Sequence, residues 1–146
     1  MSYPPDQVWA ILADFSSYAD WNPLNVWAEG KAELGASVRM RFVDAAGGKG
    51  KLIAQTVTIT ACEPGRRLAW VGHIPLLFTG RHSFELTANE GGTELRHGED
   101  LSGLVPLAFS AARLARQQSA YEAMNRALEQ RVAQLVPRDG IEPPTP

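Results

Sequence analysis

The sequence contains only one cysteine, Cys62, among its 146 residues. A single cysteine cannot form an internal disulfide, and no second thiol is present to complete a cysteine-based zinc site. We therefore expect a reduced, cytoplasmic protein that carries no metal and no other cofactor.

Long runs of one charge and long apolar runs are also missing. The chain has 14 basic and 16 acidic side chains, a net charge of −2, and no five like charges in a row. Such runs bind phosphates and anionic bilayers, so nucleic acids and membrane surfaces are not expected partners. No segment approaches the roughly 20 apolar residues of a membrane span, and residues 1–5 lack the charged and apolar regions of a signal peptide.

The length and the 45% apolar content fit one globular domain, which we predict over residues 3–136. Residues 137–146 contain four prolines and few apolar side chains. Ordering such a segment would cost conformational entropy without burying much surface, so it is predicted to be a disordered tail.

The spacing of apolar residues changes along the domain. Near the N-terminus it predicts a helix over 5–14 and a second short helix over 16–20, which should end before Pro23. The middle of the chain alternates with a period of two between turn clusters, which predicts six antiparallel strands joined in sequence. These strands are expected over 25–29, 36–43, 51–61, 67–73, 79–88 and 93–101.

The last part of the domain runs from residue 107 to Val136 without glycine or proline and predicts one long helix. Apolar residues recur along it at a spacing of three and four, so one face should pack against the sheet. This stripe consists of Leu107, Ala111, Leu114, Tyr121, Leu128, Val132 and Leu135.

Several short motifs occur in an order that is typical of one superfamily. They are Pro5-x-x-Val8-Trp9, Asp14-Phe15-x-x-Tyr18-x-x-Trp21-Asn22-Pro23, Glu63-Pro64 with Leu68-x-Trp70, and Gly92-Thr93-x-Leu95-x-His97-x-Glu99 followed by Gly103. Together they resemble the START-like superfamily also known as SRPBCC, nearest its polyketide cyclase/dehydrase branch, over about residues 3–135. The resemblance implies an α+β helix-grip fold, in which an antiparallel sheet curls around a long C-terminal helix and encloses a ligand cavity.

The sequence departs from that superfamily at its start, where a first strand ordinarily precedes the motif that begins at Pro5. Either the gene starts upstream of Met1 or this strand is absent. Its absence would leave the edge of strand 93–101 unpaired, because the first and last strands are neighbours in the superfamily fold. We expect weak dimerisation through this edge.

The hairpin 79–101 carries the candidate chemistry. If its turn lies at Glu90-Gly91, His82 faces Glu99 and Phe84 faces His97 on the helix side of the sheet. A buried histidine opposite a carboxylate could transfer protons, since each group shifts the pKa of the other. The same three polar side chains could instead be a structural contact, a polar handle for a ligand or, less readily, a zinc site.

Polar side chains also interrupt the apolar stripe of the long helix. Gln118 and Asn125 share the line of Leu114, Tyr121 and Leu128, so they could orient a ligand. A slight rotation of the helix would bury Met124 in place of Asn125. The predicted wall of the cavity on the sheet consists of Val38, Met40, Phe42, Trp70, Phe84, Leu86 and Leu95, with His97 as a polar contact.

Three functions fit these features. The first is binding or carriage of an apolar or aromatic small molecule. The second is a polyketide cyclase or dehydratase that uses His82, His97 or Glu99 as acid or base. The third is an interaction module similar to chaperone-ATPase activators, against which the alternating charges of Arg39, Arg41, Arg67, Arg81 and Glu85 argue. Because no nucleophile motif or phosphate loop is present, binding is favoured over catalysis.

Overall fold

A computed structural model describes residues 1–135, so the tail predicted over 137–146 lies outside the described residues. Helix α1 (Pro5–Leu12) has proline in its first turn, where the missing N–H leaves no hydrogen bond unmade. A 3-10 turn (Phe15–Ser17) leads into α2 (Tyr18–Trp21), which ends before Pro23 as predicted. The helix predicted over 5–14 is two residues shorter than expected.

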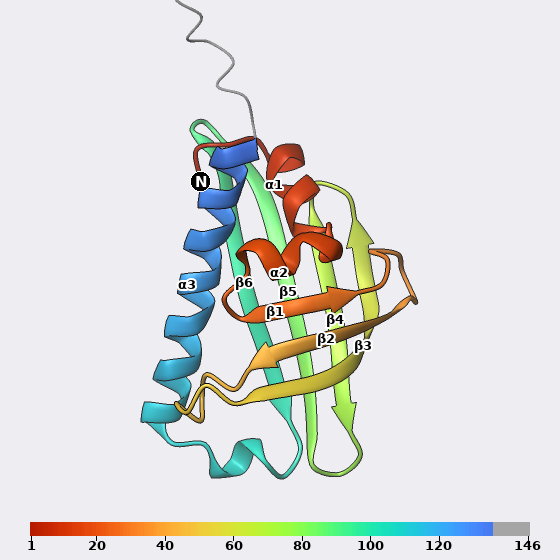
Figure 1. The fold of residues 1–146 in the computed structure, drawn as a ribbon, viewed down its shortest axis with the longest axis vertical. Coiled ribbons are helices and arrows are strands. Elements are labelled where there is room, and N and C mark those ends of the chain that lie inside the picture. Colours follow the sequence, from red (N-terminus) through yellow and green to blue (C-terminus); the bar gives the residue numbers. More distant parts are fainter. Residues whose placement is uncertain (136–146) are drawn as a thin grey trace, which may run out of the picture.

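The strands form one antiparallel sheet in which every strand pairs with its neighbour in sequence, as predicted. Figure 1 shows that this sheet is strongly curved. Register shifts in the β1–β2 and β3–β4 pairs mark bulges, which bend a sheet. The strands are β1 (Asn25–Glu29), β2 (Ser37–Val43), β3 (Leu52–Glu63), β4 (Arg67–Ile74), β5 (Phe78–Asn89) and β6 (Gly92–Ser102).

The long helix α3 (Ala111–Leu135) starts later than predicted, so Leu107 is not part of it. Pro106–Ala108 form a separate 3-10 turn, and Phe109 is extended at φ −75° and ψ 124°. The helix begins after Ser110, whose Oγ accepts a hydrogen bond from the Arg113 N–H at 3.2 Å. An N-cap serine satisfies an N–H that would have no partner inside the helix.

The hydrophobic core fills one end of the space between the sheet and α3. Figure 1 shows α1 and the C-terminal half of α3 at this end, where the β5–β6 turn also lies. Fully buried side chains from α1, the sheet and α3 meet there. They include Val8, Leu12, Val38, Phe84, Met124, Leu128 and Val132, each with 0% exposure.

The outer edge of β6 is covered at one position by the first residues of the chain. Met1 and Thr93 exchange two backbone hydrogen bonds of 2.8 and 2.9 Å, and the Thr93 hydroxyl donates to the Tyr3 carbonyl at 2.6 Å. The edge that we expected to be open is therefore paired at Thr93. No helix within residues 1–135 is both long and apolar enough to cross a membrane.

Candidate functional site

A cavity of about 400 Å³ lies between the sheet and the N-terminal half of α3, at the end opposite the core. Its wall on the sheet is mainly apolar and includes Met40, Phe42, Ile53 and Trp70. Its opening is bordered by three segments that contribute lining residues: residues 44–46, 74–78 and 101–109. An apolar wall with a few polar groups is the usual composition of a small-molecule site.

One side of the cavity carries a group of polar side chains from β5, β6 and α3. His82 and Glu99 face each other across the β5–β6 hairpin, as predicted, with His82 Nδ1 and Glu99 Oε2 3.7 Å apart. On α3, Gln117 Nε2 donates to Glu99 Oε2 at 3.0 Å and to the Tyr121 hydroxyl oxygen at 2.7 Å. Since that oxygen accepts, the hydrogen of the Tyr121 hydroxyl remains available to a ligand.

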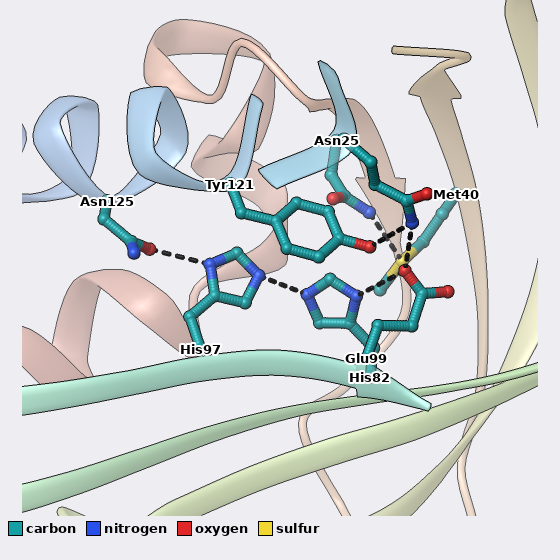
Figure 2. Close-up of polar contacts among 8 residues, drawn as sticks. Asn25, Met40, His82, His97, Glu99, Tyr121 and Asn125 are labelled. Atoms are coloured by element: carbon teal, nitrogen blue, oxygen red, sulfur yellow. Dashed lines mark hydrogen bonds and ion pairs between the residues drawn. The ribbon is translucent and has the colours of Figure 1, made fainter. Parts of the chain in front are cut away.

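Behind His82, a chain of hydrogen bonds runs away from the cavity to His97 and Asn125 (Figure 2). His97 Nδ1 lies 2.7 Å from Asn125 Oδ1, and the Nε2 atoms of His97 and His82 lie 2.5 Å apart. An amide oxygen only accepts, so His97 Nδ1 must donate. Neutral His97 then has an unprotonated Nε2, and His82 Nε2 must donate to it. Neutral His82 consequently turns the lone pair of its Nδ1 toward Glu99.

Burial keeps His97 in the neutral form that this chain requires. Desolvation and the neighbouring His82 lower the pKa of His97 to about 3, against the opposing effect of its hydrogen bond to Asn125. The hydrogen-bond direction from His82 through His97 to Asn125 is therefore held over the physiological pH range. His97 acts on the cavity only through His82, because it does not line the cavity itself.

Aromatic rings fix the positions of both histidines. The His82 ring stacks on Trp70 at 4.9 Å with an interplanar angle of 6°. The His97 ring lies between Phe84 at 4.2 Å and Tyr121 at 4.6 Å, close to parallel with each. The His97 ring is packed on both faces and the His82 ring is stacked on one, so neither rotates freely and their nitrogen atoms keep their directions.

Two further polar side chains at the cavity have buried N–H groups without a partner among residues 1–135: Gln55 at Nε2 and Arg113 at Nε. The Gln55 amide lies against Gly72, where a Cβ would come within 2.4 Å of Nε2. Glycine at position 72 therefore makes room for this amide. An oxygen atom of a ligand would satisfy such donors, because a buried N–H without an acceptor is costly.

The predicted wall residues divide between the cavity and the core. Met40, Phe42 and Trp70 line the cavity as expected. Val38, Phe84 and Leu86 do not; they are buried in the core, and the half-buried Leu95 packs at its border. The strands are longer than the cavity, so the same alternation of side chains continues from the cavity into the core.

On α3, the structure places one predicted site residue away from the cavity. Gln118 is exposed and lies outside the cavity, 3.5 Å from Glu122, whereas its neighbour Gln117 lines the cavity. Tyr121 lines the cavity as expected. Asn125 contacts His97 and Met124 is fully buried, so both residues face inward.

The zinc alternative finds no support in the geometry. Within residues 1–135, no three histidine, cysteine or acidic side chains are placed to hold a metal ion. His82 and His97 direct their Nε2 atoms at each other, so these nitrogens do not converge on a common point with Glu99. The interaction-module alternative required an apolar outer face, but Arg39, Arg41, Arg67, Arg81 and Glu85 are exposed.

Among the cavity residues that were not predicted are four polar side chains that could contact a ligand: Asn25, Gln55, Arg113 and Gln117. Gln117 could have been found, because it lies four residues before Tyr121 and seven before Met124 on one helical face. The others carry no sequence signal, since Gln55 occupies an alternating strand position like many surface residues.

A sequence profile described as "Polyketide cyclase / dehydrase and lipid transport" matches residues 2–137. The chain belongs to this family. The resemblance inferred from the motifs is thereby confirmed. No curated protein sequence matches the chain.

Solved structures similar to this family member share its fold. An aromatase/cyclase, ZhuI from a Streptomyces species, aligns with a TM-score of 0.73 and 20% identity, over 95% of this chain and 92% of the other. A Thermus thermophilus protein aligns with a TM-score of 0.71 and 16% identity over 92% of both chains. The protein Ara h 8.0201 aligns with a TM-score of 0.69 and 13% identity, over 91% and 92%.

Proposed function

We propose that the protein binds an apolar or aromatic small molecule that carries at least one hydrogen-bond-accepting oxygen. The observation that carries this proposal is the 400 Å³ cavity, whose apolar wall is interrupted by oriented polar groups. Trp70 and Phe42 would contact the apolar part of the ligand. Tyr121, Gln55 and Arg113 would donate to its oxygen atoms.

Two neighbouring residues on β3 allow a matched test. Ile53 lines the cavity, whereas the adjacent Leu52 points to the other face and is 55% exposed. Ile53→Phe should fill part of the cavity and weaken binding of the neutral fluorescent probe N-phenyl-1-naphthylamine. Leu52→Phe should leave binding unchanged. Equal binding by both variants, or no binding by the unaltered protein, would contradict the proposal.

The hydrogen-bond chain behind His82 favours proton transfer as a second candidate function. Its direction leaves the His82 Nδ1 lone pair at the cavity, beside the Glu99 carboxylate, which would stabilise the imidazolium formed when Nδ1 takes a proton. A carbon acid bound in the cavity could lose a proton to this nitrogen, as cyclisation or dehydration of a polyketide-like chain requires.

This second candidate can be tested without knowing the substrate. The protein should accelerate hydrogen–deuterium exchange at C1 of 2-tetralone, measured by proton NMR, and His82→Gln should remove that acceleration. His73→Gln, an exposed histidine outside the cavity, is the control. If His82→Gln keeps the exchange rate, His82 is not the base. If His82→Gln loses both the accelerated exchange and the binding of N-phenyl-1-naphthylamine, the residue serves binding instead.

A further inference from the structure

The surface around the cavity opening carries many apolar side chains that no other part of the described chain covers. Ten large apolar side chains are exposed among the described residues; six of them belong to the segments 74–78 and 101–109 at this opening, and a seventh lies in the first turn of α3. They are Ile74, Leu76, Leu77, Leu104, Val105, Leu107 and Leu114. Leu76 and Leu107 are the most exposed, at 85% and 82%. A gathering of this kind marks an interaction site.

These segments form one surface, because backbone hydrogen bonds join them. The Leu104 and Val105 N–H groups donate to the Leu76 and Leu77 carbonyls at 3.4 and 2.9 Å. Arg116 on α3 donates to the Ala46 carbonyl at 3.0 and 2.8 Å and so attaches the β2–β3 loop. Figure 1 shows the β4–β5 turn and the β6–α3 connection together at the same end of the molecule.

Leu76 is held in a conformation that suits another residue type. Its φ is +64°, and it is the only non-glycine residue of the described chain with a positive φ. Glycine or asparagine adopts this conformation at lower cost, and the Leu76 side chain gains nothing from burial within the protein. Leu76 therefore contributes an exposed apolar side chain to this surface at a conformational cost.

The exposed charges of the same surface are mainly basic. The segments 45–51, 74–80 and 102–121 contain Lys49, Lys51, Arg113 and Arg116 and no acidic residue, although acidic side chains outnumber basic ones in the whole chain. Asp44, at the start of the segment 44–46 beside the cavity, is the acidic exception, but it is half-buried and its Oδ1 accepts the Gly47 N–H at 3.0 Å. Exposed leucines surrounded by basic side chains fit an anionic lipid surface.

We propose that this end of the protein docks on an anionic bilayer, with Leu76 and Leu107 inserted among the lipids and Lys49 and Lys51 at the headgroups. The cavity would then open toward the acyl chains, where apolar molecules dissolve. The proposal departs from the expectation that membrane surfaces are not partners, because that expectation considered only runs of like charge along the sequence. Docking of this surface on a bilayer can be tested whichever molecule the cavity binds. An acidic protein partner or a second copy of this chain is the competing occupant.

Co-sedimentation with phosphatidylcholine vesicles, with and without phosphatidylglycerol, tests the proposal. The protein should bind the vesicles that contain phosphatidylglycerol and lose that binding as salt is raised. Leu76→Ser with Leu107→Ser should lower the partition coefficient by about tenfold or more, since two apolar side chains no longer leave water. Lys49→Gln with Lys51→Gln should reduce binding and flatten its salt dependence.

The matched control is Leu34→Ser with Leu135→Ser, which changes two leucines of 72% and 52% exposure away from the opening. It should bind vesicles like the unaltered protein. Absence of binding to phosphatidylglycerol vesicles, or equal losses in both leucine pairs, would overturn the proposal. So would a dimer, seen by sedimentation without lipid, that Leu76→Ser with Leu107→Ser abolishes, because the surface would then belong to a second copy.

Discussion

The two halves of α3 have different surroundings although they belong to one continuous helix. In the C-terminal half, Met124, Leu128 and Val132 are fully buried against the sheet and α1. In the N-terminal half, Leu114 is 49% exposed, and Gln117 and Tyr121 face the cavity. The C-terminal half completes the hydrophobic core, and the N-terminal half forms one side of the cavity. Stability is therefore expected to depend on the first half and ligand contact on the second.

The largest expected effect separates these halves directly. Leu128→Ala removes a fully buried side chain and should lower the free energy of unfolding by about 2–5 kcal/mol. Leu114→Ala, the same substitution in the other half, should change it by no more than about 0.5 kcal/mol. Urea denaturation measures both. Similar values for the two variants would mean that the helix is equally packed along its length.

A pH-dependent effect is expected at the boundary between core and cavity, where His97 lies. Its pKa is about 3 in the folded protein and near 6.5 when unfolded, so the unfolded chain takes up a proton first as pH falls. The contribution of neutral His97 to the free energy of unfolding is fully present above pH 6.5. It is lost as the pH falls toward 3, by up to about 1.4 kcal/mol per pH unit.

His97→Gln should remove this contribution. The stability difference between the unaltered protein and the variant should shrink as pH is lowered from 6.5 to about 4, measured by urea denaturation at each pH. Groups that do not contact His97 titrate alike in both proteins and cancel in the difference. A constant difference across this range would show that folded His97 binds its proton as readily as the unfolded chain does.

A smaller difference in stability is expected between two threonine substitutions, one at the core end of the molecule and one near the cavity opening. Thr93 is fully buried and donates to the Tyr3 carbonyl, so Thr93→Val leaves that carbonyl without its partner and should cost about 1 kcal/mol. Thr79, near the opening, contacts His73 at an exposed position, and Thr79→Val should cost less than about 0.5 kcal/mol. Thermal unfolding resolves this difference. A larger loss at Thr79 would show that the opening is more rigid than its exposure indicates.

The register of the β5–β6 hairpin could be predicted because it depends on local chemistry. A turn at Glu90-Gly91 and the alternation of Phe84, Leu86 and Leu95 leave one arrangement that buries the apolar face. This arrangement placed His82 opposite Glu99, as the structure confirms. The short Nε2–Nε2 contact between His82 and His97 was not foreseen, since it depends on how two rings pack between neighbours.

The errors have equally specific causes. The start of α3 was placed too early because residues 107–110 contain no glycine or proline, yet the 3-10 turn begun by Pro106 ends in an extended Phe109. Gln118 was predicted from the three-four spacing of the helix, whereas the structure turns its neighbour Gln117 to the cavity. The cytoplasmic location and weak dimerisation stay predictions.

The sequence by itself determined the family, the order of the elements and the face that each strand turns inward, because these follow from short motifs and local periodicity. Only the tertiary structure decided which inward-facing residues fill the core and which leave a cavity. Phe84 and Phe42 both point inward from their strands. Phe84 lies in the core together with α1 and Leu128, whereas Phe42 lines the cavity. It also brought Lys49, Leu76 and Leu107 to one end, since contacts between distant segments leave no local pattern in the sequence.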